Sequence, residues 1–390
     1  MRILFLPKWY PHRYDPMPGL FVQKQAEALS RYCDISVLYV HEDTECTGNL
    51  EIVDSTENRV RVIRIYYRAV KSGPGIITAV IRLFRYLNAY RHGLRIFRTF
   101  ASDFLHVHVL TRLGLIAFLY KLFTGTPYII TEHWSRYFPL NGTYRGSLRK
   151  MITRCVVRHA SGVIAVSEKL KNAMLAGKLD NPVFRVIPNP VDMEKFSFRN
   201  DLNEPKPEKK IIIHISCFED KSKNISGLLK ILQKVALKRD DFECRLIGVG
   251  PDLQKMIDLA RALGLLDKTV FFQGLKDHDD LSGSIRQSDF LVMSSNYETF
   301  GSVVIECLAC GIPVLATDVG IVSEVLNEKN GMIIPPGDEI QMLKALDYML
   351  DNCRKYDKHQ IRESVATSYD NKTVGKQLYR MYVELLTRKS

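Results

Sequence analysis

The sequence predicts an α/β protein of two doubly wound domains, and three observations support this prediction. The chain has 390 residues, which is enough for two domains of ordinary size. Hydrophobic residues make up 46% of the chain, which is enough for two cores and argues against disorder. Short apolar segments alternate with longer amphipathic segments, a pattern typical of parallel sheets covered by helices.

The clearest repeating unit lies within residues 289–326. The apolar segment Phe290–Met293 is followed by Ser-Ser-Asn, which predicts a buried strand that runs into a loop. A helix is expected from about Phe300 to the Gly-Ile-Pro at 311–313, which stops it. Val314–Ala316 then forms a second strand. Strand, loop, helix and strand in this order build parallel sheets.

The same patterns predict the other elements in chain order. Strands are expected at Met1–Pro7, Asp34–Val40, Val60–Tyr67, Phe104–Val109, Pro127–Thr131, Val163–Val166, Phe184–Ile187, Ile211–Ser216, Glu243–Ile247, Thr269–Phe272 and Gly331–Ile334. Helices are expected at Leu20–Tyr32, 76–100, 113–123, 142–159, 225–239, 279–286, 339–353 and 372–388. The polar segment His41–Asn58 is expected to be a surface excursion. Asn200–Lys210 contains two prolines and is expected to link the domains.

The composition excludes several classes of protein. No apolar run reaches the ~18 residues of a transmembrane helix. Met1–Pro7 is too short for a signal peptide, so we expect a cytoplasmic chain. The eight cysteines are scattered. Only Cys307 and Cys310 have C-x-x-C spacing, and no second pair or nearby histidine completes a zinc site. We expect reduced packing cysteines and no metal site.

Positive charge is concentrated in the first half of the chain. Residues 1–190 hold 27 Lys/Arg and 13 Asp/Glu, a net charge of +14, whereas the remainder has a net charge of −2. Arg59–Arg98 contains ten basic residues and no acidic residue, and 142–159 is a second basic helix. A basic amphipathic helix at 76–100 indicates an anionic membrane surface as a partner. Alternatively, its arginines face solvent while its apolar side packs on the sheet. No recognition motif accompanies the charge, so nucleic acid is not expected.

Two carboxylates flank the start of the helix expected near Phe300. Glu298 lies in the loop before it and Glu306 lies within it. Between them, the backbone N–H groups of Gly301, Ser302 and Val303 can form an anion site, and the glycine allows a ligand to approach closely. The site thus has one carboxylate that accepts hydrogen bonds on each side of an anion site. This order matches the ribose hydroxyls, diphosphate and sugar hydroxyls of a nucleotide sugar.

The segment ETFGSVVIE at 298–306 resembles the Glu-x7-Glu motif of the family-4 retaining glycosyltransferases of the GT-B fold, of the bacterial cell-surface polysaccharide type. Gly-Ile-Pro-Val at 311–314 and Asp-Val-Gly at 318–320 resemble that family as well. The resemblance implies two Rossmann-like domains that face each other across a cleft. The implied acceptor domain is 1–198, joined by a returning C-terminal helix at about 372–390, and the implied donor domain is 199–371.

The resemblance also implies roles for individual residues. Glu306 would hold the ribose hydroxyls, and Glu298 would contact the donor sugar. His133 lies at the carboxyl end of a predicted strand, where open α/β sheets bind ligands, and it matches a histidine that faces the donor sugar. Phe300 and the anion site would lie against the donor.

Two loops match the family only in part. Lys223 matches a lysine that binds the donor diphosphate, but the usual arginine is missing and Cys217 stands about where it would fall. Lys221 is a candidate replacement. Gly19, at the mouth of the first strand–helix crossover, is what remains of a glycine pair that closes against the donor phosphates or the acceptor.

The implied activity is retaining transfer of a hexosyl unit from a UDP- or GDP-linked sugar to a hydroxyl of a glycan or lipid-linked acceptor. No cofactor is implied beyond this donor substrate, and no Asp-x-Asp metal motif is present. The enzyme would act in cell-surface polysaccharide or glycolipid synthesis, at the inner face of the cell membrane as a peripheral protein. The alternatives are a nucleotide-sugar epimerase of the same fold and a non-catalytic nucleotide-sugar binding module at the membrane surface.

Overall fold

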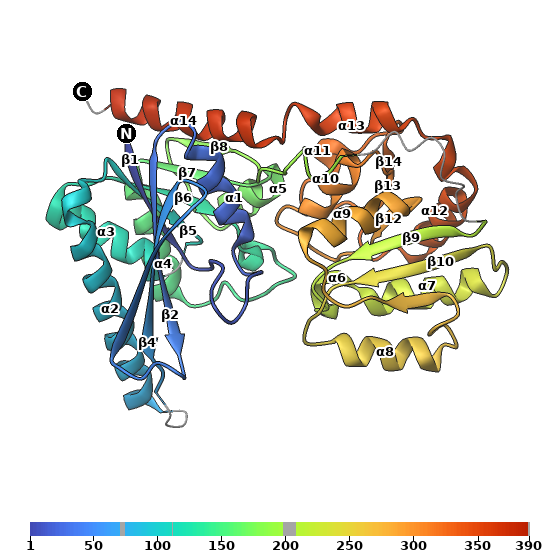
Figure 1. Ribbon diagram of the computed structural model, residues 1–390, viewed down its shortest axis with the longest axis horizontal. Coiled ribbons are helices and arrows are strands. Elements are labelled where there is room, and N and C mark those ends of the chain that lie inside the picture. Colours follow the sequence, from blue (N-terminus) through green and yellow to red (C-terminus); the bar gives the residue numbers. More distant parts are fainter. Residues whose placement is uncertain (71–74, 111, 198–207, 389–390) are drawn as a thin grey trace.

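A computed structural model describes residues 1–70, 75–110, 112–197 and 208–388. It consists of two lobes side by side, each built on one twisted sheet (Figure 1). The first sheet has eight strands in the order β3-β4-β2-β1-β5-β6-β7-β8, and the second has six in the order β11-β10-β9-β12-β13-β14. Every strand pairing is parallel except that of β3 with β4. The structure thus confirms a GT-B-like pair of doubly wound domains.

The strands have the following bounds. The first sheet contains β1 (Arg2–Pro7), β2 (Asp34–Asp43), β3 (Leu50–Glu57), β4 (Val60–Arg68), β5 (Phe104–His108), β6 (Tyr128–Glu132), β7 (Gly162–Ala165) and β8 (Phe184–Val186). The second contains β9 (Lys210–Ile215), β10 (Phe242–Ile247), β11 (Val270–Phe272), β12 (Phe290–Met293), β13 (Val314–Thr317) and β14 (Gly331–Ile334).

The helices fall into two groups along the chain. The first lobe contains α1 (Leu20–Leu29), α2 (Ile76–Ile96), α3 (Arg112–Thr124), α4 (Ser147–His159) and α5 (Glu168–Ala176). The second contains α6 (Asp220–Lys223), α7 (Ile225–Ala236), α8 (Leu253–Ala262), α9 (His278–Gln287), α10 (Ser302–Ala309), α11 (Val322–Val325), α12 (Glu339–Asn352) and α13 (Lys358–Ala366). The last helix, α14 (Asn371–Thr387), returns to the first lobe (Figure 1). No helix of the described residues is long and apolar enough to span a bilayer.

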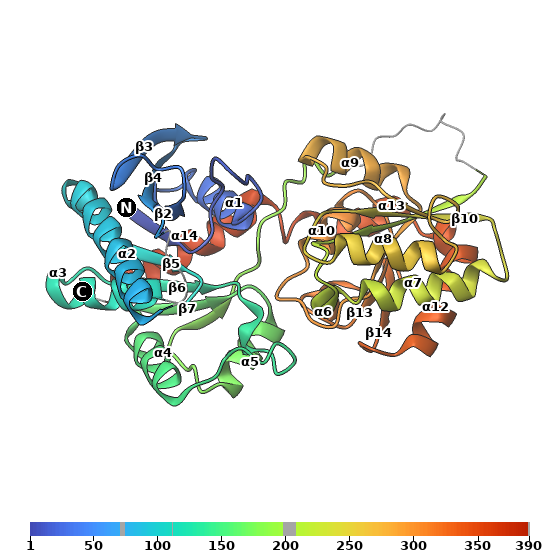
Figure 2. The ribbon, with the colours of Figure 1, turned by 90° about the horizontal axis from the view of Figure 1, so that it is seen from below.

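Both faces of the first sheet are buried, as parallel sheets require. Successive residues of β1 point to opposite faces, so Ile3 and Phe5 join one core and Leu4 and Leu6 join the other. The first core is covered by α1 and α14, and the second by α2, α3, α4 and α5. Figure 2 shows α1 and α14 on one side of the sheet and α2 and α3 on the other.

The return of α14 confirms the helix expected at the C-terminus. Gly375 lies so close to α1 that a Cβ there would come within 2.5 Å of the Ala28 carbonyl oxygen. Tyr382 is fully buried, and its hydroxyl is 2.5 Å from Nδ1 of His106 on β5. Tyr379 stacks on Tyr32 with ring centroids 5.7 Å apart. The helix is thus an integral layer of the first lobe.

The expectation that His41–Asn58 forms a surface excursion is wrong. β2 continues to Asp43, and Leu50–Glu57 is an antiparallel edge strand paired with β4. None of its residues is buried, so polar side chains are tolerated and the apolar alternation that marks a strand is lost. The linker expected at 200–210 falls mostly outside the described residues, and its last residue, Lys210, begins β9.

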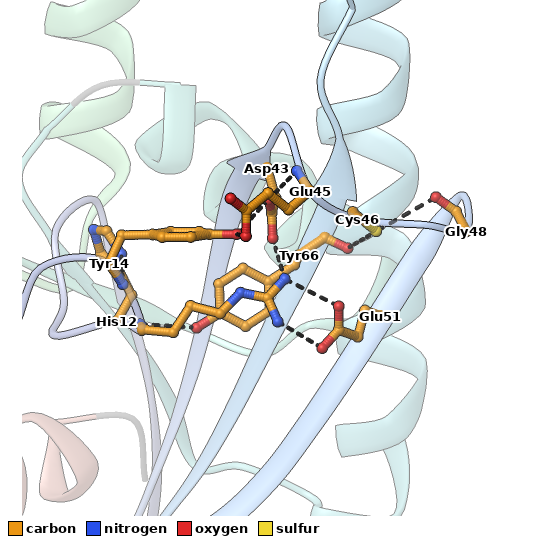
Figure 3. A network of polar contacts seen from close by, with 9 residues as sticks. His12, Tyr14, Asp43, Glu45, Cys46, Gly48, Glu51 and Tyr66 are labelled. Carbon is orange, nitrogen blue, oxygen red and sulfur yellow. Dashed lines mark hydrogen bonds and ion pairs between the residues drawn. The ribbon is translucent and has the colours of Figure 1, made fainter.

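The loop after β1 is tied to the edge of the sheet by Arg13, whose guanidinium forms ion pairs with Asp43 and Glu51. Its Cζ atom lies 4.0 Å from the ring centroid of Tyr66. Figure 3 shows these carboxylates converging from β2 and β3, and the Tyr14 hydroxyl donating to Asp43 at 2.7 Å. These contacts fix a long loop beside the carboxyl end of β1.

Four histidines are buried in the two lobes. Burial lowers the pKa of His106 and His133 to about 3 and that of His214 to about 4, and it holds the pKa of His108 well below its ordinary value. The folded protein therefore keeps these rings neutral at pH values where an unfolded histidine, with a pKa of about 6.5, takes up a proton. The contribution of these buried neutral rings to the free energy of unfolding is fully present above about pH 6.5. It is lost as the pH falls toward the pKa values of the folded protein.

We predict that the first lobe loses stability between pH 7 and pH 5, before most carboxylates titrate. Each histidine contributes a slope of up to about 1.4 kcal/mol per pH unit below pH 6.5. Urea unfolding followed by tryptophan fluorescence reports on this lobe, because Trp9 and Trp134 are the only tryptophans. His106→Gln should flatten the dependence, whereas exposed His92→Gln should not. Equal slopes in all three proteins would contradict the assignment.

Candidate functional site

The candidate site lies where the carboxyl ends of the central strands of the second sheet face the first lobe. β9 and β12 are neighbours, so the loops that follow them meet. The first loop carries Lys223 at the end of α6, and the second carries Glu298 just before α10. Open α/β sheets bind ligands at such carboxyl edges.

Lys223 and Glu298 form an ion pair in which Nζ lies 2.5 Å from Oε1. The two side chains are only 15% and 14% exposed. Ser295, which the sequence analysis missed, donates its hydroxyl to the same carboxylate oxygen at 3.0 Å. Burial alone would lower the pKa of Lys223, but the neighbouring Glu298 carboxylate outweighs it and the pKa is raised. The site therefore keeps a fixed ammonium group within a largely enclosed loop.

The N-terminus of α10 provides the backbone anion site. Gly301 precedes it with a φ of +89°, a left-handed conformation that favours glycine. No side chain of the described residues caps this helix. The first-turn N–H groups, including those of Ser302 and Val303, are therefore available to an anion. A Cβ on Gly301 would meet no atom closer than 3.9 Å, so it is the positive φ and not crowding that favours glycine here.

Phe300 anchors this loop in the hydrophobic core. Its side chain is 2% exposed and belongs to the hydrophobic core. Its carbonyl accepts a hydrogen bond from the backbone N–H of Ile321 at 2.9 Å. This approach needs Gly320, because a Cβ there would lie 2.3 Å from the Phe300 oxygen. Any contact of Phe300 with a ligand would therefore come through its backbone.

Glu306 lies on α10 and is 7% exposed. Its Oε1 is 3.6 Å from Nζ of Lys24, which belongs to α1 of the first lobe. The sequence analysis missed Lys24, because a single lysine on an amphipathic helix carries no signal without its distant partner. The two lobes thus meet directly at the second carboxylate of the site.

The start of α5 makes a second contact between the lobes. The Ser167 hydroxyl donates to the Thr299 carbonyl at 2.6 Å, within the loop that carries Glu298. Lys169 forms an ion pair with Asp318 and donates to the Asp318 carbonyl at 2.6 Å. These bonds hold the Glu298 loop against the carboxyl edge of the first sheet.

His133 follows β6 at that edge and is buried. Its Nε2 is 3.3 Å from Nδ1 of His108, and its ring lies 4.4 Å from that of Phe21. The other nitrogen, Nδ1, is buried without a hydrogen-bond partner among the described residues. Burial keeps the ring neutral, with a pKa of about 3. His133 can therefore exchange a hydrogen bond with an uncharged group, such as a sugar hydroxyl.

Glu132 fixes the turn that presents His133. Its carboxylate accepts hydrogen bonds from the backbone N–H groups of Leu110, His133 and Trp134 at 2.8–3.0 Å, and from the Tyr137 hydroxyl at 3.0 Å. Burial raises the pKa of Glu132 although these bonds oppose the shift. The sequence analysis gave Glu132 no role.

The structure brings three other predicted residues near the interface without defining a ligand contact. Gly19 has a φ of +74°, and a Cβ on it would lie 2.1 Å from the Trp9 carbonyl oxygen. The glycine is thus required by its own loop. Lys221 donates to the Asn141 carbonyl of the first lobe at 3.1 Å, and Cys217 is exposed on the loop after β9. Within the described residues, no group of three or more His, Cys, Asp or Glu side chains could hold a metal ion.

Both halves of the chain are similar in sequence to known proteins. Residues 195–364 match the family model "Glycosyl transferases group 1", and residues 18–190 match "Glycosyl transferase 4-like domain". N-acetyl-alpha-D-glucosaminyl L-malate synthase of Bacillus anthracis is 27% identical over 300 residues, 73% of this chain and 75% of that protein.

Solved structures show the same fold. Sucrose-phosphate synthase of Thermosynechococcus elongatus aligns over 100% of both chains with a TM-score of 0.80 and 20% identity. HepE of Anabaena in complex with UDP aligns over 98% of this chain and 100% of its own, with a TM-score of 0.72 and 14% identity.

Proposed function

The chain is a glycosyltransferase of the GT-B fold, and we propose that it transfers a hexosyl unit with retention from a nucleotide diphosphate sugar. The acceptor is a hydroxyl of a glycan or a lipid-linked molecule, in cell-surface polysaccharide or glycolipid synthesis. The observation that carries the proposal is the Lys223–Glu298 pair, which lies beside the open N-terminus of α10.

The leaving diphosphate needs positive charge that is already in place. The N–H groups of Ser302 and Val303 and the dipole of α10 supply part of it, and the Lys223 ammonium supplies the rest. When the donor binds, its phosphate oxygens share Lys223 with Glu298. These groups provide the charge for which other enzymes use a metal ion, so we infer that no metal is required. HepE, which shares the fold, was solved in complex with UDP, and this supports a nucleoside diphosphate as part of the donor.

The sugar would lie between the lobes. Glu306 accepts from the ribose hydroxyls and releases Lys24, while Glu298 accepts from hydroxyls of the transferred sugar. His133 reaches this sugar from the first lobe through its unpartnered Nδ1. The acceptor hydroxyl approaches the anomeric carbon on the face that the diphosphate leaves, and the departing phosphate oxygen takes its proton. This sequence retains the anomeric configuration without a covalent enzyme intermediate.

The first lobe has the surface expected for a lipid-linked acceptor. Three neighbouring helices, α2, α3 and α4, expose large apolar side chains: Ile76, Ile77, Val80, Leu83, Phe84, Leu87, Leu115, Leu119, Leu122, Phe123, Leu148, Met151 and Ile152. Arg82 and Arg85 on α2 and Arg149 and Arg154 on α4 border them. Apolar and basic residues together favour an anionic bilayer. We propose that this surface, the α2–α4 face, holds the enzyme peripherally on the inner membrane leaflet.

The donor site predicts which nucleotides stabilise the protein. A ligand at 100 times its Kd raises the free energy of unfolding by about 2.7 kcal/mol. In a thermal-shift panel of nucleoside diphosphates and their sugars, we expect UDP or GDP and a matching sugar to raise Tm, with or without chelator. Lys223→Met should lose the shift, and Lys255→Met on α8, which is exposed, should keep it. A chelator-sensitive shift would overturn metal independence, and no shift from any nucleotide would contradict the donor site.

The two carboxylates should differ in their kinetic effects. We expect Glu306→Gln to raise the donor KM by roughly 10- to 100-fold, because a charged hydrogen-bond acceptor is lost. Glu298→Gln should mainly lower kcat, by roughly 100-fold, because its contacts strengthen as the sugar becomes cationic. The rate of nucleoside diphosphate release gives both the donor KM and kcat. Glu363→Gln, at an exposed position, is the matched control. Equal and mild effects would contradict the assignment, and release of an epimer would favour the epimerase.

The α2–α4 face predicts salt-sensitive membrane binding. The protein should bind vesicles that contain phosphatidylglycerol, and binding should weaken as salt screens the arginines. Phe84→Ser with Phe123→Ser should reduce binding at least roughly tenfold, since each exposed ring contributes about 1.5–3 kcal/mol when buried. Leu237→Ser, at an equally exposed position in the second lobe, should have no effect. Salt-insensitive binding, or no binding, would contradict the proposal.

A further inference from the structure

A pocket of about 680 Å³ lies in the first lobe, between the carboxyl edge of the sheet and the helices α2, α3 and α4. Its wall combines basic and apolar side chains. Lys8 comes from the end of β1, Arg112 from the start of α3, Arg136 from the turn after β6, and Arg149 from α4. Trp134, which also lines the pocket, follows His133 directly. The pocket therefore opens at the edge where the donor sugar is proposed to meet its acceptor.

The four cations have no carboxylate in direct contact. No lining residue is acidic, and none of the four forms an ion pair with an acidic residue of the described chain. The buried Glu132 carboxylate interacts electrostatically with Lys8 and Arg136, but its hydrogen bonds go to backbone N–H groups and the Tyr137 hydroxyl. One carboxylate cannot balance four cations. A concentration of unpaired positive charge in a half-enclosed pocket indicates an anionic ligand.

Tryptophan rings hold two of the cations, Lys8 and Arg136, in place. Nζ of Lys8 lies 3.2 Å from the ring centroid of Trp134 and 4.3 Å from that of Trp9. Cζ of Arg136 lies 3.5 Å from the ring centroid of Trp134. Nε of Arg136 is buried without a hydrogen-bond partner among the described residues. Burial and the charge of Arg136 lower the pKa of Lys8 to about 8. The pocket is organised, but its hydrogen-bonding capacity is not satisfied.

The remaining wall is apolar. Tyr86 and Tyr90 come from α2, Leu115 from α3, and Leu148 and Ile152 from α4. The last three also belong to the α2–α4 face, so the pocket is continuous with the surface that we assign to the membrane. An anionic group at the sheet edge and an apolar chain along the helices would satisfy both parts of the wall.

We propose that this pocket holds the phosphate or diphosphate group of a prenyl-linked sugar acceptor, with the prenyl chain leaving across α3 and α4 toward the bilayer. This inference rests on the proposed function and specifies its acceptor. Lys8, Arg112, Arg136 and Arg149 neutralise the phosphate oxygens, and guanidinium groups suit these oxygens through paired hydrogen bonds. The sugar joined to the phosphate then lies beside His133, toward the cleft. A soluble acidic glycan would use the cations but not the apolar wall.

Tryptophan fluorescence can test this assignment directly, because the only two tryptophans of the chain both contact Lys8. The protein is first saturated with the nucleoside diphosphate that stabilises it, so that the donor site cannot bind the probe. Farnesyl diphosphate should then change the fluorescence with saturation. Farnesol, which lacks the anion, and inorganic pyrophosphate, which lacks the chain, should each bind at least roughly tenfold more weakly. Equal binding of farnesol or of pyrophosphate would overturn the proposal.

Matched variants distinguish binding in this pocket from general attraction to a basic lobe. Arg136→Gln and Arg149→Gln should each weaken farnesyl diphosphate binding at least roughly tenfold, as expected for loss of a charged hydrogen-bond donor. Arg158→Gln removes the same charge from an exposed position on α4 and should leave the affinity unchanged. Isothermal calorimetry measures the same affinities independently of fluorescence. If Arg136→Gln does not fold, Arg149→Gln alone tests the pocket.

The outcomes distinguish the two proposals. Nucleoside diphosphate binding without farnesyl diphosphate binding overturns the acceptor pocket and leaves the transferase. Equal losses in Arg149→Gln and Arg158→Gln show non-specific charge attraction and also overturn the pocket. Absence of nucleotide binding overturns the proposed donor site itself.

Discussion

The ion pair between Lys223 and Glu298 is the interaction on which the donor side of the molecule depends. β9 and β12 are adjacent at the centre of the second sheet, so the loops after them must share a small space. An unpaired ammonium or carboxylate at such depth would be costly, and loss of one partner of a buried pair typically costs about 3–5 kcal/mol. The pair therefore fixes both loops and places the N-terminus of α10 beside a permanent positive charge.

The sequence predicts best where burial and local signals coincide. β12 has its expected bounds because an apolar run meets serines at the point where the strand leaves the core. β3 was missed because both of its faces are exposed and its side chains were free to be polar. Lys24 and the pocket cations could not be assigned, since Lys8, Arg112, Arg136 and Arg149 lie in four separate segments. Only the parallel order of β1, β5 and β6 brings these segments to one edge.

The basic residues of the first lobe fall into two groups with different partners. At the sheet edge, Arg13, Arg61 and Arg64 are paired with carboxylates of β2 and β3, and they serve structure. Around α3, α4 and the turn after β6, the cations lie over aromatic rings or donate to backbone carbonyls, and none of Lys8, Arg112, Arg136 and Arg149 forms an ion pair with a carboxylate of the described residues. Net charge alone cannot distinguish these arrangements. Because one group of arginines is paired with carboxylates, a strongly basic domain can concentrate its unpaired charge in the proposed anion pocket. The whole surface of the domain then does not attract anions equally.

The connection between the lobes allows the two halves of the site to approach. Residues near 191–197 and 369–371 cross from one lobe to the other side by side, because the Val191 N–H bonds to the Tyr369 carbonyl at 2.8 Å. Arg362 on α13 donates to the carbonyls of Met193 and Phe196, each at 2.8 Å. Two adjacent crossings held in this way form a narrow pivot. Rotation about it would change the distance between Lys24 and Glu306 while each sheet keeps its own core. If Glu306 holds the donor as proposed, donor binding would then be coupled to closure of the cleft.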